Sequence, residues 1–541
     1  MPLTNQKRNV TVIRTSRRGF LGAASAVAVG GLSLRPSVAG SGSRPSEPYR
    51  VITDLSEQYD DLRQGTNLRW KGSPKRIAFP KNAEDVAHEV ALIRDTGLVP
   101  AVRSGGHCYE DFVSNGRVTA IIDTSAMNQV SWDPNMKAFE VGAGAQLGAV
   151  YQLLYKQWGV YVPAGNCPTV AAGGHIAGGG YGSMNRRDGL VVDHLHAVEV
   201  VHMRADGSVA ISRGTRDPND PHHDLWWAYT GGGGGNFGIA TRYWLRSPQA
   251  IGDAPETALP RPPRHVWIST VSWNWDTLDE AAFKRLMTNH AKWHEKHSAP
   301  DAPETALFSQ LKTWHRTNGA VTMDTIVDDA AQDAAGMLAR YVQAVSDGVG
   351  APAILQERRV PWMQATQWAG FTGPDPTRRF DGKSAYLKRA WTDEMLSAAY
   401  AGLTDPRMTN PVALLMIASY GGAVNSIAPE DTAVAQRDSI IKFQVVSIWD
   451  DPEKDAENIA WTRNTYAGMF ASSGGVPVPN GTVDGAFINY CDTDLDDPRF
   501  NRSELSSFDL YYKQNFSRLQ KVRNTYDPKE FFRHGQSIPL T

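Results

Sequence analysis

The sequence predicts an α+β fold divided into at least two lobes, and three observations support this prediction. With 541 residues, of which 41% are hydrophobic and 21% charged, the chain can bury more core than one typical domain needs. Short apolar strands alternate with helices in the first half, as in nucleotide-binding α/β units. A stretch rich in proline and alanine from 250 to 263 then precedes a second region of strands and longer helices.

The elements of the first lobe follow from apolar periodicity and helix capping. Arg76 to Phe79 predicts a strand, and Asn82 can cap a helix that carries Val86, Val90, Ile93 and Gly97 on one face. We expect further strands at 99–102, 118–122 and 139–141, a helix at 146–157, and a hairpin of 196–203 and 208–212 that turns at Asp206-Gly207.

The second lobe is expected to contain an antiparallel sheet backed by helices. Predicted strands cover 266–273, 307–314 and 320–326, and predicted helices cover 278–297 and an alanine-rich stretch that ends at 345. In the tail, Leu510, Phe516, Leu519 and Val522 are spaced to bury one side of a single helix over 510–523.

Charge and cysteine content exclude several classes of protein. A formal net charge of -2, without a long block of one sign, gives no attraction to nucleic acid. The three cysteines, Cys108, Cys167 and Cys491, are too few for a disulfide framework and lack the paired spacing of zinc ligands, so we expect no metal site. At least one thiol must have another use.

The N-terminus predicts a twin-arginine signal peptide over residues 1–39. Ser16-Arg17-Arg18-Gly19-Phe20-Leu21 precedes an apolar run, 22–34, and the cleavage candidate Ser37-Val38-Ala39. The run is shorter than the ~20 apolar residues that span a bilayer, although a permanent anchor stays an alternative. We therefore expect contact with the twin-arginine export machinery, a secreted or extracytoplasmic mature protein starting near Gly40, and no membrane association after cleavage.

Two glycine-rich segments allow close approach of a ligand to the backbone. In Arg103-Ser104-Gly105-Gly106-His107 the glycines leave room for a pyrophosphate, although a structural histidine is the simpler interpretation of so short a motif. The segment Gly165–Gly182 contains too many glycines for a plain helix or strand. Since it keeps apolar residues and has no linker composition, we expect an ordered ligand cradle.

A third segment, 230–238, only superficially matches a dinucleotide-binding fingerprint. It lacks the preceding strand and the acidic residue about 20 positions later that such a site requires. We therefore exclude an NAD site.

Together, these segments resemble the berberine bridge enzyme-like branch of the FAD-linked oxidases, whose PCMH-type FAD-binding fold is shared with vanillyl-alcohol oxidase. The similarity runs in order through RSGGH (103–107), GNCPTVAAGGHIAGGGYG (165–182), RRDGLVVDHL (186–195), GGGGGNFGIAT (231–241) and YYKQNFSRL (511–519). The resemblance implies an FAD lobe of two α/β subdomains at 46–248, a substrate lobe at 266–484, and a C-terminal segment, 485–541, that completes the FAD lobe.

The resemblance also implies that FAD is attached by two covalent bonds. In that family the histidine of RSGGH bonds the flavin 8α carbon and the cysteine of GxCPT bonds flavin C6; these positions are His107 and Cys167. Cys108 and Cys491 lie in no such motif, and we interpret both as packing residues. The other cofactor-binding residues expected are Arg103, Ser104, Gly105, Gly106, Gly173, Gly174, His175, Gly179, Gly180, Gly182, Asn236, Gly238 and Asn489.

The family's substrate-side base is the tyrosine of an NYxD element, which matches Tyr490 here. A phenol with a pKa near 10 is a poor base at pH 7, so a neighbour must stabilise its phenolate or accept its proton. We expect Tyr420 to be this neighbour and to contact the substrate. Without the resemblance, both tyrosines would be interpreted as core residues.

Two further positions bear on the reaction that the resemblance implies. Gln444 aligns with a position where some plant members carry a catalytic glutamate. Because an amide cannot take a proton, we expect Gln444 to donate a hydrogen bond to the substrate, which favours oxidation of an alcohol or sugar over alkaloid ring closure. Val170 falls where the family varies the side chain that controls access of oxygen, and a valine favours O2 as the electron acceptor.

We therefore expect an oxidase that removes hydride from a carbinol of a carbohydrate, a glycosylated natural product or another secondary metabolite, and releases H2O2. A dehydrogenase that reduces a quinone or carrier protein is one alternative. A secreted flavoprotein without enzymatic activity is the other.

Overall fold

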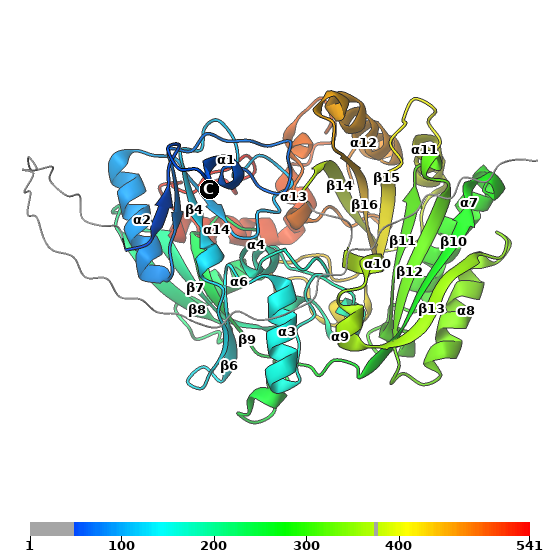
Figure 1. Cartoon of the computed structure of the whole chain (residues 1–541), viewed down its shortest axis with the longest axis horizontal. Helices are drawn as coiled ribbons and strands as arrows, with labels where there is room; N and C mark the ends of the chain where they lie inside the picture. Colours follow the sequence, from blue (N-terminus) through cyan, green and yellow to red (C-terminus); the bar gives the residue numbers. More distant parts are fainter. Residues whose placement is uncertain (1–47, 373–376) are drawn as a thin grey trace, which may run out of the picture. The chain divides into compact units, whose positions relative to one another are not determined.

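Three β-sheets organise the part of the chain that the computed structural model describes, residues 48–372 and 377–541 (Figure 1). These residues belong to one compact unit, Glu47–Thr541, which contains all three sheets. The predicted signal peptide lies outside the described residues. Within the described ranges, no helix combines the length and the apolar character needed to cross a membrane.

The first sheet has four strands in the order β1-β2-β4-β3. Its strands are β1 (Arg50–Ile52), β2 (Arg76–Phe79), β3 (Pro100–Arg103) and β4 (Ala120–Asp123), with parallel pairing of β4 to both β2 and β3. Helix α2 (Ala83–Thr96) begins where Asn82 accepts a hydrogen bond from the amide of Asp85, and it ends at Gly97, whose φ is 64°. These elements confirm the predicted strands and cap.

The second sheet has five antiparallel strands in the order β5-β6-β9-β7-β8. They are β5 (Val130–Asp133), β6 (Ala138–Gly142), β7 (Leu195–Met203), β8 (Val209–Thr215) and β9 (Ile239–Leu245). The predicted hairpin is β7–β8, with Gly207 at φ 83°. The predicted helix at 146–157 is α3 (Leu147–Trp158).

The third sheet has seven antiparallel strands in the order β13-β10-β12-β11-β15-β16-β14. The strands are β10 (His265–Asn274), β11 (Leu307–Trp314), β12 (Ala320–Asp328), β13 (Ala353–Pro361), β14 (Arg379–Leu387), β15 (Ala413–Ser419) and β16 (Ile441–Trp449). Helices α7 (Glu280–Lys296), α8 (Ala334–Ser346), α11 (Asp393–Leu403) and α12 (Asp455–Met469) back this sheet (Figure 1). This arrangement confirms the predicted α+β class.

Short helices connect the larger elements: α1 (Tyr59–Leu62), α4 (Ala172–Ala177), α5 (Asn185–Asp188), α6 (His223–Ala228), α9 (Trp362–Ala365) and α10 (Ala369–Thr372). The predicted domain boundaries near 248, 266 and 485 stay predictions.

The C-terminal tail differs from the single helix that the sequence predicts. It forms α13 (Ser507–Tyr512) and α14 (Phe516–Tyr526), separated at Lys513, whose φ of 51° is left-handed and interrupts a helix. Leu510, Leu519 and Val522 are nevertheless buried as expected. The buried Arg523 of α14 donates hydrogen bonds to the carbonyls of Asn236 and Phe532, which ties the tail to the glycine-rich segment 230–238.

Candidate active site

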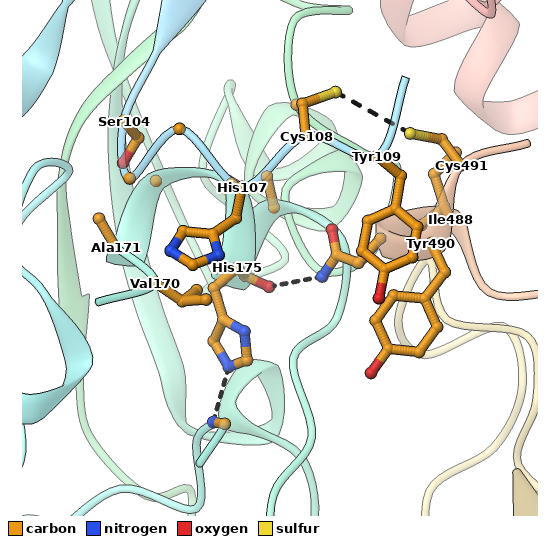
Figure 2. Close-up of a pocket in the computed structure, with 18 of the residues that line it drawn as sticks. Ser104, His107, Cys108, Tyr109, Val170, Ala171, His175, Ile488, Tyr490 and Cys491 are labelled. Atoms are coloured by element: carbon orange, nitrogen blue, oxygen red, sulfur yellow. Dashed lines mark hydrogen bonds between the residues drawn. The ribbon is translucent and has the colours of Figure 1, made fainter. Parts of the chain in front are cut away.

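A cavity of about 560 Å³ brings together the glycine-rich segments, the C-terminal segment and the open face of the seven-stranded sheet. Figure 2 shows His107, His175, Tyr109 and Tyr490 at this cavity. The predicted site residues that line it are Arg103, Ser104, Gly105, Gly106, His107, Cys167, Gly173, Gly174, His175, Asn236, Gly238, Gln444, Asn489 and Tyr490. Val170 lines it as well.

His107 and Cys167 meet at one hydroxyl group. The Nε2 atom of His107 lies 3.0 Å from Oγ1 of Thr169, and the Sγ atom of Cys167 lies 3.5 Å from the same oxygen. Burial lowers the pKa of His107 to about 4. The effect of burial outweighs that of the hydrogen bond at Thr169, which raises the pKa. The imidazole is therefore neutral at pH 7, and a neutral ring keeps a lone pair that can form a bond to an electrophilic carbon.

The glycine-rich segments leave space where side chains would project into the cavity. A Cβ atom at Gly174 or Gly234 would meet no described atom within 4 Å, although both residues line the cavity. At Gly105 a Cβ would instead collide with the amide nitrogen of Ala171, because the two segments touch there. A cradle of exposed backbone beside the neutral His107 imidazole suits an extended, planar group, and the residues present fit FAD.

Three of the predicted cofactor-binding residues, Gly179, Gly180 and Gly182, lie outside the cavity lining. Gly179 packs against Val434 at φ 106°, and Gly180 packs against the His175 ring at φ 49°. Within the same segment, residues Ala172–Ala177 form the short helix α4. Packing against neighbours, rather than ligand contact, accounts for these three glycines.

Several predicted cofactor residues use their side chains within the protein. The Arg103 guanidinium donates to a carboxylate oxygen of Asp123 at 2.6 Å, and the Ser104 hydroxyl donates to the carbonyl of Ala143 at 2.6 Å. The Oδ1 atom of Asn236 accepts from the amide of Ile538 at 3.0 Å. These residues can contribute to a ligand site chiefly by shaping the backbone.

His175 and Asn489 connect the cradle to the C-terminal segment. The ring Nε2 atom of His175 accepts from the amide of Gly165 at 3.0 Å, and its carbonyl accepts from Nδ2 of Asn489 at 3.1 Å (Figure 2). Burial, with a smaller contribution from Lys442, lowers the pKa of His175 to about 3. His175 therefore acts as a neutral structural acceptor.

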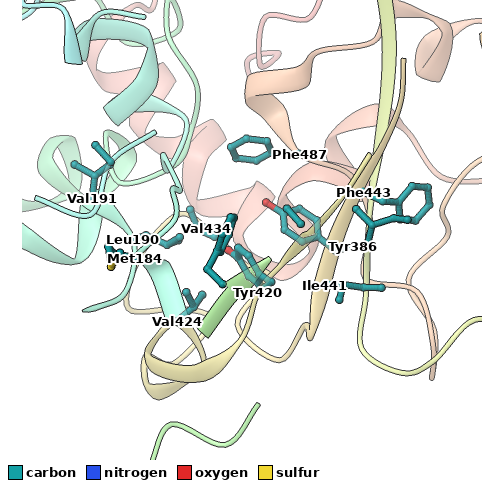
Figure 3. Packing of buried hydrophobic residues seen from close by; sticks show 14 of the residues in the cluster. Met184, Leu190, Val191, Tyr386, Tyr420, Val424, Val434, Ile441, Phe443 and Phe487 are labelled. Carbon is teal, nitrogen blue, oxygen red and sulfur yellow. The ribbon is translucent and has the colours of Figure 1, made fainter. Parts of the chain in front are cut away.

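Tyr490 is paired with a different tyrosine from the one predicted. Its hydroxyl lies 2.9 Å from the hydroxyl of Tyr181, and its ring stacks on Tyr109 with centroids 4.9 Å apart. Tyr420 lies outside the cavity lining, in a buried cluster with Tyr386, Val424 and Val434 (Figure 3). The structure therefore does not bring Tyr420 to the cavity lining; its ring packs on Tyr386, with centroids 5.2 Å apart.

Lys442 is a functional candidate that the sequence analysis missed. Its Nζ atom lies 3.1 Å from the ring centroid of Tyr181, 3.6 Å from that of Phe487 and 4.5 Å from that of Tyr490. Its side chain is buried, and no described atom accepts a hydrogen bond from Nζ. The sequence did contain a signal, because Lys442 interrupts the largely apolar run of β16. It lies two positions before Gln444, on the same face of the strand.

The open face of the seven-stranded sheet forms the opposite wall of the cavity. Gln444 donates from Nε2 to the hydroxyl of Tyr109 at 2.7 Å, which fixes its amide at the cavity. The remaining wall from this sheet and α10 combines three polar or amphipathic side chains with apolar ones: Gln310, Lys312, Trp314, Phe371, Val412, Leu414, Met416, Val446 and Ile448. None of these residues stood out in the sequence, because they come from separate strands.

Comparisons with known proteins agree with this geometry. A family model described as an FAD binding domain matches residues 74–212, and one described as berberine and berberine like matches residues 486–539.

Two curated relatives and one solved structure match over nearly their whole length. The aclacinomycin-N/aclacinomycin-A oxidase of Streptomyces galilaeus is 42% identical, covering 97% of this chain and 98% of that protein. The hexose oxidase of Chondrus crispus is 30% identical, covering 91% of this chain and 97% of that protein. A glycopeptide hexose oxidase solved in complex with teicoplanin is 41% identical, with a TM-score of 0.87 over 91% of this chain and 99% of that one.

Proposed function

This chain belongs to the berberine bridge enzyme-like family of FAD-linked oxidoreductases, and from that premise we propose that it oxidises a carbinol of a glycosylated secondary metabolite and reduces O2 to H2O2. The observation that carries the proposal is that Tyr490, His107 and Cys167, far apart in the sequence, line one cavity with a glycine cradle. FAD held in this cradle supplies a two-electron acceptor.

His107 and Cys167 are the residues that we propose to hold FAD covalently. The neutral imidazole and the thiol both reach the Thr169 hydroxyl, so they can act on the same small region of a ligand. Attachment at two points would keep the cofactor in place although the cavity also opens onto the sheet. Such a site can admit a large substrate without losing its cofactor.

Tyr490 is the proposed base that takes the proton of the substrate hydroxyl. Burial raises the pKa of Tyr490 well above 10, so the phenolate needs support from its surroundings. The hydroxyl of Tyr181 can donate a hydrogen bond to the Tyr490 oxygen, and the Nζ atom of Lys442 lies over both rings. Burial lowers the pKa of Lys442, and in its ammonium form this residue would stabilise negative charge on the tyrosine pair, which makes it a positioning residue.

The cavity wall supports a substrate that joins a polar part to an apolar part. Gln444 and Tyr109 offer hydrogen-bonding groups close to Tyr490, as a sugar ring requires. Leu414, Met416 and Val446 offer an apolar surface farther along the sheet, as an aromatic aglycone requires. The names of the relatives, an aclacinomycin oxidase and hexose oxidases, support the same class.

Export through the twin-arginine route is part of the same proposal, supported by Arg17-Arg18 and the apolar run after it. Sequencing the N-terminus of the protein recovered from culture medium tests it. A start near Gly40 is expected, and retention of the whole chain in the cytoplasm would contradict it.

The test of the oxidase activity combines two readouts on the purified protein with a panel of free sugars and aromatic glycosides. We expect a glycoside to bleach the flavin without oxygen and to release peroxide with oxygen. Fast bleaching without peroxide would indicate a dehydrogenase instead. A flavin that stays oxidised with every compound would contradict an enzymatic role for these alcohols.

Acid precipitation and a peptide map test the attachment of the cofactor. We expect the flavin to precipitate with the protein and its mass to be found on peptides that contain His107 and Cys167. Flavin that is released entirely into the supernatant would refute covalent attachment.

A further inference from the structure

Two cysteines that are 383 positions apart in the chain face each other at the cavity. The Sγ atoms of Cys108 and Cys491 lie 4.0 Å apart, and the two side chains point toward one another (Figure 2). Both residues line the cavity. This pairing differs from the packing role that we expected for each cysteine alone.

Each cysteine is bonded directly to a residue of the proposed machinery. Cys108 lies between His107 and Tyr109, and Cys491 follows Tyr490. Since Tyr109 stacks on Tyr490, the two segments already touch through their rings. A bond between the sulfur atoms would therefore join the segment of the proposed flavin attachment to the segment of the proposed base.

The surroundings of the pair favour oxidation over metal binding. Throughout the described ranges, no group of three His, Cys, Asp or Glu side chains could hold a metal ion. The contact with Cys108 and burial raise the pKa of Cys491 well above its usual value, so Cys491 stays a thiol. Cys108 is less buried, which makes it the sulfur that an oxidant entering from the cavity meets first.

We propose that Cys108 and Cys491 are a peroxide-oxidised pair that forms a disulfide between the His107 and Tyr490 segments. The inference rests on the proposed function for its oxidant, because an oxidase makes H2O2 inside this cavity. The Cys108 sulfur attacks one peroxide oxygen as its thiol gives up its proton, the O–O bond breaks, and the departing hydroxide takes that proton, so that a sulfenic acid and one water form. The Cys491 thiol then attacks the Cys108 sulfur, the S–O bond breaks, and the disulfide and a second water form.

The distance between the sulfur atoms is compatible with this step. A disulfide has an S–S length of about 2.05 Å, so the two sulfur atoms must approach by about 2 Å. Side-chain rotation of two facing cysteines can supply such a movement. The resulting bond would fix Tyr109 against Tyr490 and make the geometry of the base depend on the oxidation state of the pair.

The experiment measures the bond in the purified, flavin-containing full-length protein. The protein is reduced with dithiothreitol, freed of reductant, and divided into one sample with added H2O2 and one with oxygen and an aromatic glycoside that bleaches the flavin. We expect a cross-linked peptide joining Cys108 to Cys491, lighter by two hydrogen atoms than the two peptides together. In Cys491→Ser, we expect Cys108 to stop at the sulfenic acid, which a 1,3-dione reagent labels.

The outcomes separate this inference from the oxidase proposal. A cross-link with added H2O2 but none during turnover would keep the thiol pair and count against peroxide production. A cross-link during turnover that catalase prevents supports both. If added H2O2 takes Cys108 to the sulfinic acid without a cross-link, or leaves both thiols reduced, the inference is overturned whatever the oxidase assay gives.

Discussion

Two lysines are buried on neighbouring strands of the seven-stranded sheet, and their surroundings are opposite. Lys383 of β14 donates from Nζ to carboxylate oxygens of Asp492 at 2.7 Å and Asp494 at 2.6 Å. Lys442 of β16 has aromatic rings around its Nζ atom, and no described carboxylate pairs with it. Burial lowers the pKa of both ammonium groups, but at Lys383 the carboxylates outweigh burial and raise it.

The comparison separates a structural use of a buried charge from a functional one. A buried ammonium with two carboxylates is compensated, whereas a buried ammonium without an anion loses hydration for no gain in stability. Such an uncompensated group is typical of active sites. Both lysines contact the Tyr490 segment: Lys383 anchors it through Asp492, and the Nζ atom of Lys442 lies 4.5 Å from the centroid of the Tyr490 ring.

The largest effect is expected at Tyr490. Tyr490→Phe should lower kcat by about 10²- to 10⁴-fold, the usual contribution of a general base, without affecting the proposed flavin attachment. Stopped-flow bleaching of the flavin measures the change. Tyr420→Phe is the matched control and should keep nearly full turnover, because its ring packs on Tyr386 outside the cavity lining. Equal losses in both variants would refute the assignment.

Lys383→Met should have the next largest effect, and on stability. Removal of this ammonium leaves Asp492 and Asp494 buried with less compensation, which should cost about 3–5 kcal/mol of unfolding free energy. Arg463 still pairs with Asp494, so we expect the lower end of that range. Thermal and urea unfolding measure it. A variant as stable as the native protein would show that the ion pairs do not anchor the segment.

Lys442→Met should lower activity and leave stability unchanged or higher, because it removes a buried lysine that has no anionic partner among the described residues. The loss of a cation over the rings is worth about 2 kcal/mol, so kcat/KM should fall by about 10- to 100-fold while stability is kept or rises. Without the positive charge the pKa of Tyr490 rises, so the acidic limb of the pH–rate profile should move to higher pH. Lys442→Arg should restore the native profile in part. A large loss of stability with an unmoved profile would make Lys442 structural.

The sequence predicted those features that depend on residues close together in the chain. The Asn82 cap and the β7–β8 hairpin depend on neighbours in the chain, and both were predicted. The motifs that contain His107 and Cys167 are local as well, and the structure places both residues at the cavity.

The residues that were missed act through contacts between distant parts of the chain. Tyr181 meets Tyr490 across 309 positions, and Lys442 reaches both rings from another strand. Tyr420 was predicted from the family resemblance, whereas its environment is decided by how the end of β15 packs. Local patterns fix caps, turns and cofactor motifs, but they do not decide which aromatic ring faces which.

The smallest effect concerns Glu110, whose carboxyl group lies near Asp492, one of the two carboxylates that pair with Lys383. Burial, and then the charge of Asp492, raise the pKa of Glu110 to about 7, although the residue accepts a hydrogen bond from the amide of Thr493. Because the folded-state pKa lies above the unfolded value of about 4.3, this group's contribution to stability is complete below that value and is lost as the pH rises through 7.

Glu110→Gln should therefore remove this loss. Since Glu110 keeps partial exposure to solvent, we expect the variant to gain about 1 kcal/mol over the native protein at pH 8 and nothing at pH 4. Urea unfolding at the two pH values measures the difference. Glu430→Gln, at an exposed position, is the control and should change neither value. A gain that is equal at both pH values would mean that the amide acts through packing, and that the carboxyl charge of Glu110 is already compensated like that of Asp494.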